Sequence, residues 1–358
     1  MKTITTLIAE AIELLKKLIE TPSFSGEENQ TALLIANWFD QNNIPYTREN
    51  NNLWAYNLHF DSTKPTLLLN SHHDTVKPNQ GYTLDPFTAL EKDGKIFGLG
   101  SNDAGGCLVS LLATFTYFYA QENLSHNIVI VASAEEESSG PNGLNSVLKQ
   151  LPELDCAIVG EPTEMQLAIA EKGLLVLDVT VNGTASHAAH TNNDNPIYNA
   201  LQIIEWFQSY HFEKVSEILG PVKMTVTQIN AGKQHNVVPS QCHLVVDIRV
   251  NELYTNTEIL NIVTENVKAI IQPRSMHLNA SSIAPEHPLV QSGIALGRTT
   301  YGSPTLSDQS VLYCRSLKLG PGNSLRSHTA DEFIFRDEVE TGIALYIQIL
   351  NGFLIQKI

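Results

Sequence analysis

The amino-acid sequence predicts an α/β fold with two domains: a mostly parallel sheet with helices on both faces, and a second, inserted unit of the order βαββαβ. The chain has 358 residues, a length that exceeds the roughly 100–200 residues of one domain. Of these residues 42% are hydrophobic. Short apolar runs alternate with helical patterns in both outer parts, whereas strands in the middle alternate strictly between apolar and other side chains. We therefore expect the first domain to comprise residues 1–172 and 285–358, and the inserted domain residues 173–284.

The chain begins with an expected amphipathic helix over residues 7–19, which Thr21 and Pro22 end. Ser25 stands three residues before Glu28, and this spacing predicts a capping box at the start of the next helix. Continuous apolar runs bounded by turn residues predict buried strands. They are Thr66–Leu69, Ile128–Ser133 and Cys156–Val159.

The middle of the chain has the element order of a ferredoxin-like unit. The expected elements are a strand over 175–181, a helix from Pro196, strands over 224–229 and 242–250, a helix over 259–270 and an extended stretch near 275–283. After residue 285 the pattern of strands and helices of the first domain returns, so the unit is expected to be an insertion.

Charge and composition exclude several classes of partner. The formal net charge is −16, from 38 acidic and 22 basic residues, and no Lys/Arg cluster reverses it locally. We therefore expect no nucleic-acid and no membrane partner. The start of the chain lacks the unbroken apolar region of a signal peptide, so a cytoplasmic location is expected. Four scattered cysteines without a C-x-x-C pattern predict thiols rather than a disulfide scaffold.

Side chains that suit a metal site follow the predicted strands of the first domain. They are His72 and Asp74, Asp103 after a glycine-rich stretch and at the start of an expected helix, the triplet Glu135–Glu137, and Glu161. Because the carboxyl ends of parallel strands meet at one edge of a sheet, these segments are expected to converge. Imidazole nitrogen and carboxylate oxygen are ordinary ligands of catalytic zinc.

Each segment has a simpler explanation when taken alone. An acidic triplet after a strand is commonly a solvated loop, and an isolated H-x-D is commonly a surface feature. The stretch Gly98–Gly106 does not complete a G-x-G-x-x-G phosphate loop, and a G-x-S-x-G serine-hydrolase motif is absent from the sequence. A site for two zinc ions explains all the segments together, because two close cations need a shared carboxylate.

In chain order, these segments resemble the motifs of the M20 metallopeptidase and deacylase family. The similar stretches are Ser71–Val76, Gly100–Gly106, Ala134–Glu137, Gly160–Thr163, and Ser327-His328 with Asp331-Glu332. The resemblance covers nearly the whole chain and implies a zinc-dependent exopeptidase-like domain with a lid or dimerisation insert. The sequence departs from the family at Ala104-Gly105, where Met-Lys is usual, and at Glu135, where Asp is commoner.

The resemblance implies a metal centre with two Zn²⁺ ions per chain, for which Co²⁺ or Mn²⁺ could substitute. Asp103 would bridge the two ions. His72 and Glu161 would complete the ligands of one ion, and Glu137 and His328 those of the other. His73 occupies a variable position of the motif and is not expected to be a ligand.

Five further residues receive roles from the same resemblance. Asp74 would hold the His72 ring in one tautomer, and Glu136 would be the general base. In the inserted domain, His187 would reach the site of a neighbouring subunit and steady the oxyanion. Arg249 is the candidate for binding a substrate carboxylate, and Asn236 lies in a matching lid motif. The competing interpretation of Arg249 is an ordinary strand arginine, and that of His187 is a surface histidine.

The expected function is therefore hydrolysis of a small N-acyl amino acid by a homodimer. Within the family, the sequence is most similar to the acetylornithine deacetylase type, which implies removal of an acetyl or succinyl group from ornithine or citrulline in arginine biosynthesis. The alternatives are a succinyl-diaminopimelate desuccinylase, a dipeptidase or carboxypeptidase with the same centre, and a non-catalytic binding protein with the same fold.

Overall fold

The computed structural model describes residues 2–355, which divide into two compact units. Unit 1 comprises residues up to Ile169 together with Ser282–Tyr301 and those from Ser307 onward, and unit 2 comprises Ala170–Ser281 and Gly302–Leu306. Unit 1 buries two apolar clusters, and unit 2 has a third of its own. Each unit therefore has its own hydrophobic core, as a domain requires.

The large sheet of unit 1 is parallel at its centre. Its strands run in the order β1-β2-β6-β3-β7-β17-β8-β15, with β16 paired to β8. Their bounds are β1 Thr47–Glu49, β2 Asn52–Tyr56, β3 Thr66–His72, β6 Asn127–Ser133, β7 Cys156–Val159, β8 Leu167–Glu171, β15 Ser281–Ser282, β16 Thr300–Ser303 and β17 Arg315–Lys318. Strands β6, β3, β7 and β17 are parallel neighbours, whereas β2 and β8 pair antiparallel with β6 and β17. The predicted mostly parallel sheet is confirmed.

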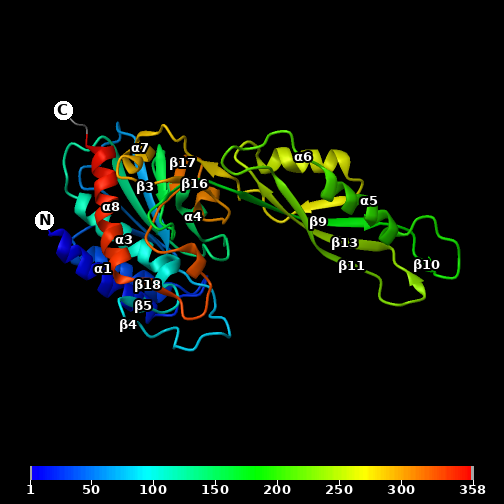
Figure 1. The fold of residues 1–358 in the computed structure, drawn as a ribbon, viewed down its shortest axis with the longest axis horizontal. Helices are drawn as coiled ribbons and strands as arrows, with labels where there is room; N and C mark the ends of the chain where they lie inside the picture. The colour runs from blue at the N-terminus through cyan, green and yellow to red at the C-terminus, as the bar shows by residue number, and fades with distance from the viewer. Residues whose placement is uncertain (1, 356–358) are drawn as a thin grey trace. The chain divides into compact units, whose positions relative to one another are not determined.

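Helices cover both faces of this sheet (Figure 1). They are α1 Ile4–Ile19, α2 Asn29–Gln41, α3 Gly106–Phe118, α4 Leu144–Val147, α7 Pro288–Ile294 and α8 Arg336–Leu354. Along β3, Leu67 and Leu69 join the cluster under α1, α3 and α8, whereas Leu68 joins the cluster that contains Leu144 and Val147 of α4. Because alternate side chains of a strand point to opposite faces, a continuous apolar run satisfies both layers. A small sheet of β4 (Leu90–Lys92), β5 (Lys95–Phe97) and β18 (Phe333–Phe335) stands apart.

Unit 2 contains one antiparallel sheet and two helices. Its elements are β9 Gly173–Asn182, α5 Pro196–Ser209, β11 Lys223–Ala231, β13 Gln241–Val250, α6 Asn256–Asn266 and β14 Ile270–Pro273. The strands lie in the order β11-β13-β9-β14, and all neighbours are antiparallel. This is the βαββαβ order of a ferredoxin-like unit. Two short strands, β10 (Ser186–His187) and β12 (Val237–Val238), form a separate ladder.

Three local predictions are wrong. Helix α6 ends at Asn266, and the last strand of unit 2 is 270–273 rather than 275–283. The spacing of Val267 and Ile270 imitates a helical face, but Val267 is already extended, with φ −108° and ψ 115°. The predicted helix at Asp103 begins only at Gly106, because Asp103 and Ala104 have non-helical backbone angles.

The predicted capping box at α2 is also wrong, and its failure bears on the site. Helix α2 begins at Asn29, and its N-cap residue Glu28 makes no side-chain capping bond. The Ser25 hydroxyl instead donates to Asp74 Oδ2 at 2.7 Å. Ser25 is therefore bound to the strand-end motif, not to the helix.

All four cysteines are free thiols, as predicted. Among the helices that the structure describes, none combines the length and the hydropathy needed to cross a bilayer.

Candidate metal centre

The predicted convergence of strand ends is present in unit 1. His72 is the last residue of β3, the triplet Glu135–Glu137 follows β6, and Glu161 follows β7. Since β6, β3 and β7 are parallel neighbours, these three segments leave the sheet at the same edge. Asp103 and His328 reach this edge on loops that precede α3 and β18.

The carboxylate of Asp103 lies between two imidazoles. Its Oδ1 is 3.3 Å from Nε2 of His72, and its Oδ2 is 3.7 Å from Nε2 of His328. On the far side, Glu137 Oε2 is 3.0 Å from His328 Nε2, and Glu161 Oε1 is 3.8 Å from His72 Nε2. The five predicted ligands thus form two groups that share Asp103.

The site suits divalent cations by two independent observations. His72 is 1% exposed, and its buried Nε2 has no hydrogen-bond partner in the part of the chain that the structure describes. A buried nitrogen of this kind costs free energy unless it is hydrogen-bonded or bound to a ligand. In addition, His72, Asp103 and Glu137 offer ligand atoms that all lie within 4.8 Å of one another. Nitrogen and oxygen ligands at this spacing fit a catalytic metal centre.

The pKa values of the site are shifted because it is buried and holds several carboxylates close together. Burial and the charge of Asp103 raise the pKa of Glu161 to about 8. Burial raises the pKa of Glu136 well above its usual range, with a further contribution from Glu161. The hydrogen bond to Glu137 raises the pKa of His328 to about 9. Bound cations would offset this accumulation of carboxylates.

Asp74 contacts both His72 and the turn that follows β6. Its Oδ1 is 3.3 Å from His72 Nδ1, on the opposite side of the ring from Nε2. The same carboxylate accepts the backbone amides of Glu136 and Glu137, each at 3.1 Å. It therefore holds His72 and the turn that carries Glu136 in one arrangement. The Glu136 Oε2 atom lies 3.9 Å from His72 Nε2.

Both ring nitrogens of His73 contact residues outside the cluster. Its Nδ1 is 2.9 Å from Thr31 Oγ1, and its Nε2 is 2.8 Å from the carbonyl oxygen of Asn51. Both ring nitrogens therefore have partners outside the site.

Sequence reasoning assigned no role to Glu332, although it stands in the last motif. Its carboxylate accepts the backbone amides of Gly100, Asn102 and Asp103 at 3.1, 2.8 and 2.9 Å. Burial and the charge of Asp103 raise the pKa of Glu332 to about 8. In the same loop Gly100 has φ +75°, and a Cβ there would meet Thr75 Cγ2 at 2.6 Å, so the loop requires glycine.

A second supporting group lies under the strand ends. Asp308 Oδ2 accepts the hydroxyl of Ser133, the last residue of β6, at 2.6 Å. Burial raises the pKa of Asp308 to about 6. Only the fold brings Asp308 to Ser133, just before the acidic triplet.

The remaining candidates lie in unit 2. His187 pairs with Val237 in the β10–β12 ladder, and its Nδ1 accepts the amide of Ala189 at 3.1 Å. Asn236 precedes β12, and its carbonyl accepts the Ala188 amide. His187 and Asn236 are both exposed. Arg249 forms a bidentate ion pair with Asp247, at 2.9 and 3.1 Å. The guanidinium is therefore engaged within its own strand.

Comparisons with known proteins place this fold and site in context. A model of the peptidase family M20/M25/M40 matches residues 68–352. The chain is 27% identical to an acetylornithine deacetylase from Proteus mirabilis, over 96% of each chain. It is 30% identical to a succinyl-diaminopimelate desuccinylase from Wigglesworthia glossinidia brevipalpis, over 56% of each chain. A dinuclear metal-binding peptidase of the M20 family from Bacillus subtilis aligns with a TM-score of 0.70 at 16% identity, over 97% of this chain and 98% of that one.

The fold, the site and these similarities define a metal-dependent hydrolase of amide bonds. The family model spans most of the chain, and it includes both the strand ends that carry the ligands and the loop of His328. The chain belongs to the peptidase family M20/M25/M40.

Proposed function

We propose that this enzyme removes an acetyl or succinyl group from the α-nitrogen of ornithine or citrulline, a step of arginine biosynthesis, with two Zn²⁺ ions per chain. The observation that carries the proposal is the arrangement of Asp103 between His72 and His328 in a chain similar over 96% of its length to an acetylornithine deacetylase. The desuccinylase similarity spans only 56% of the chain, which favours ornithine or citrulline over diaminopimelate as the amine.

The proposed ligand sets share Asp103. His72 and Glu161 would hold one ion, and Glu137 and His328 the other. Bound divalent ions would acidify a water molecule and polarise the scissile carbonyl. The nitrogen and oxygen ligands suit zinc, and Co²⁺ or Mn²⁺ would be accepted by the same set.

The chain's own residues would move the proton. Glu136 Oε2 would accept a proton as the water oxygen bonds to the carbonyl carbon, and would pass it to the leaving nitrogen as the C–N bond breaks. The products are a free carboxylate and an amine. Asp74 keeps the backbone of Glu136 in place through the bond to its amide, so the base is held before substrate binds.

Unit 2 would complete the site in a homodimer. His187 of one subunit would donate to the developing oxyanion in the site of the other. Asn236, directly before the strand that pairs with His187, would contact the substrate beside it. The guanidinium of Arg249 would release Asp247 and bind the substrate carboxylate in its place. We propose a cytoplasmic enzyme whose only partners are its substrate and a second copy of the chain.

A substrate panel tests the proposal. Amine release would be measured from N-acetyl and N-succinyl conjugates of ornithine, citrulline and diaminopimelate, and from dipeptides, with zinc present and with zinc chelated. A zinc-dependent preference for an ornithine or citrulline conjugate is expected. Preference for a diaminopimelate conjugate or a dipeptide would contradict the proposed substrate but support the proposed amide hydrolysis. No zinc-dependent release from a broad panel would favour a binding protein with this fold.

A further inference from the structure

A second group of metal-ligand side chains lies at the other end of the large sheet. Asp155 and Cys156 stand where β7 begins, and His287 is the N-cap residue of α7. A carboxylate oxygen, the thiol sulfur and an imidazole nitrogen of these three residues all lie within 4.8 Å of one another. Because the ligands of the first centre leave the carboxyl ends of the same strands, the two groups lie at opposite edges of the sheet.

The imidazoles beside Asp155 are held in place by their Nδ1 atoms. His287 Nδ1 accepts the Leu289 amide at 3.3 Å, and His126 Nδ1 is 2.9 Å from Ser125 Oγ. The Phe353 ring packs against both, with centroids 4.6 Å from His126 and 5.9 Å from His287. Nε2 of His126 lies 3.6 Å from Asp155 Oδ2. Because Nδ1 of His287 accepts, Nε2 of that neutral ring carries the proton, and an ion binds the Nδ1 lone pair in exchange for the 3.3 Å bond to Leu289.

An ion pair between Asp155 and a histidine does not explain the group at neutral pH. Burial lowers the pKa of His126 and of His287, so both rings are neutral there. Burial and the Asp155 charge raise the pKa of the Cys156 thiol. Asp155 also pairs with Arg315, whose 62% exposed side chain lies 3.6 Å from Oδ1, the oxygen that is not paired with His126.

We propose that Asp155, Cys156 and His287 bind one transition-metal ion of the zinc type, with the fourth position open beside His126. Sulfur, nitrogen and oxygen together are a ligand set that zinc accepts in tetrahedral geometry. The ion displaces the Cys156 proton to solvent and draws the ligand atoms to the roughly 3.3–3.8 Å separations of a tetrahedral site. Bound there, it ties β7 to the start of α7.

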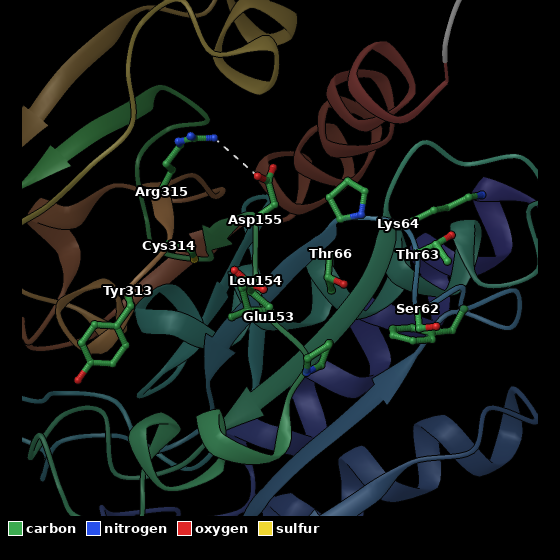
Figure 2. Close-up of a pocket in the computed structure, with 13 residues that line it drawn as sticks. Ser62, Thr63, Lys64, Thr66, Glu153, Leu154, Asp155, Tyr313, Cys314 and Arg315 are labelled. Carbon is green, nitrogen blue, oxygen red and sulfur yellow. Dashed lines mark ion pairs between the residues drawn. The ribbon is translucent and has the colours of Figure 1, made fainter.

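The structure provides a route for the ion. Asp155 lies in the wall of a cavity of about 640 Å³, together with Lys64, Tyr313 and Arg315 (Figure 2). The Asp155 side chain is 34% exposed, so an ion reaches its carboxylate from solvent.

Cobalt absorption distinguishes this site from the first centre, because only a thiolate ligand produces sulfur-to-cobalt charge transfer in the near ultraviolet and no cysteine is among the ligands of the first centre. The intact enzyme would be loaded with Co²⁺ and titrated with Zn²⁺. We expect a charge-transfer band in the wild type that Zn²⁺ removes and that Cys156→Ser abolishes. Cys314→Ser and Cys107→Ser are the matched controls and should keep the band.

A second variant distinguishes loss of a metal ligand from misfolding caused by the buried Cys156→Ser substitution. In His287→Asn the amide oxygen still caps α7 in place of Nδ1, while the imidazole ligand is lost. We expect its cobalt affinity at the thiolate site to fall by at least about tenfold, since even supporting residues cost about 10–100-fold. Absence of the band in the wild type, or its survival in Cys156→Ser, would overturn the proposal. The readout is independent of the substrate and of turnover, so it stands or fails separately from the proposed function.

Discussion

The carboxylate of Glu332 accepts the backbone amide hydrogen of Asp103 at 2.9 Å. The same group accepts the amides of Gly100 and Asn102, so one buried side chain holds the whole loop that carries Asp103, the proposed shared ligand. A carboxylate that bridges two ions would have to keep both oxygens directed at two partners. The residue that fixes this loop lies more than two hundred positions away in the sequence.

Substituting Glu332 should therefore weaken metal binding without removing a ligand. In Glu332→Gln the amide can accept fewer of the three backbone hydrogens, and we expect metal affinity to fall by about 10–100-fold. Metal content after dialysis against a graded chelator measures this. Asp331→Asn is the control, because the Asp331 carboxylate accepts from Thr83 and Leu84 instead. Equal losses in the two variants would contradict the specific role of Glu332.

Glu136→Gln should abolish turnover while leaving the metal centre intact. Loss of the proton-accepting oxygen is expected to lower kcat by about 10²–10⁴-fold. Metal content and substrate binding should remain, since Glu136 is not a proposed ligand. The neighbouring Glu135→Gln is the matched control, because the Glu135 carboxylate accepts from the backbone and side chain of Asn142. Near-normal turnover of Glu136→Gln would assign the proton transfer elsewhere.

Ser25→Ala should affect activity rather than helix stability. Its hydroxyl donates to the Asp74 carboxylate, and losing that bond should lower kcat/KM by about tenfold, in line with the roughly 1.5–3 kcal/mol of a hydrogen bond to a charged group. The contrasting variant is Thr3→Ala, since Thr3 does cap α1 by accepting from Thr6. That change should cost about 1 kcal/mol of stability and spare activity. If Ser25→Ala instead lowered stability and spared activity, Ser25 would cap α2 after all.

Metal affinity should rise with pH. The hydrogen bond to Glu137 raises the pKa of His328 to about 9, above its ordinary 6.5, so metal-free His328 carries a proton at pH 7. A metal ion binds the neutral imidazole, so the proton on His328 must leave first. Its displacement lowers the apparent affinity about tenfold for each unit of pH below 9. Chelator competition at pH 6 and pH 8 should differ by roughly 100-fold for one proton. An affinity that does not change over this range would show that His328 binds no metal.

Mixed dimers test whether subunits share sites. A His187→Ala subunit keeps Glu136, and a Glu136→Gln subunit keeps His187, so one of the two sites in each mixed dimer would have both groups. We expect activity that neither variant has alone, measured on dimers purified through two different tags. If verified mixed dimers remain inactive, His187 does not serve a neighbouring site.

Much of the fold and of the centre is predictable from local patterns. Continuous apolar runs such as Ile128–Ser133 indicate strands covered on both faces, and strict alternation over Gln241–Val250 indicates a sheet covered on one. Polar residues directly after three such runs imply a common edge. The boundaries at Asn266 and Gly106 were not predictable, because spacing alone does not show where an extended residue interrupts a helical period.

The sequence by itself therefore determined which residue types end the strands, and with them the chemistry of the centre. Only the tertiary structure decided what Ser25, Glu332 and Asp308 do. Their partners lie far away in the sequence, and a hydroxyl or carboxylate forms its bond with whichever group the fold brings to it. The group of Asp155, Cys156 and His287 is invisible to motif analysis for the same reason: α7 lies far along the chain from β7, and packing of α7 against the sheet brings its N-cap histidine to the thiol.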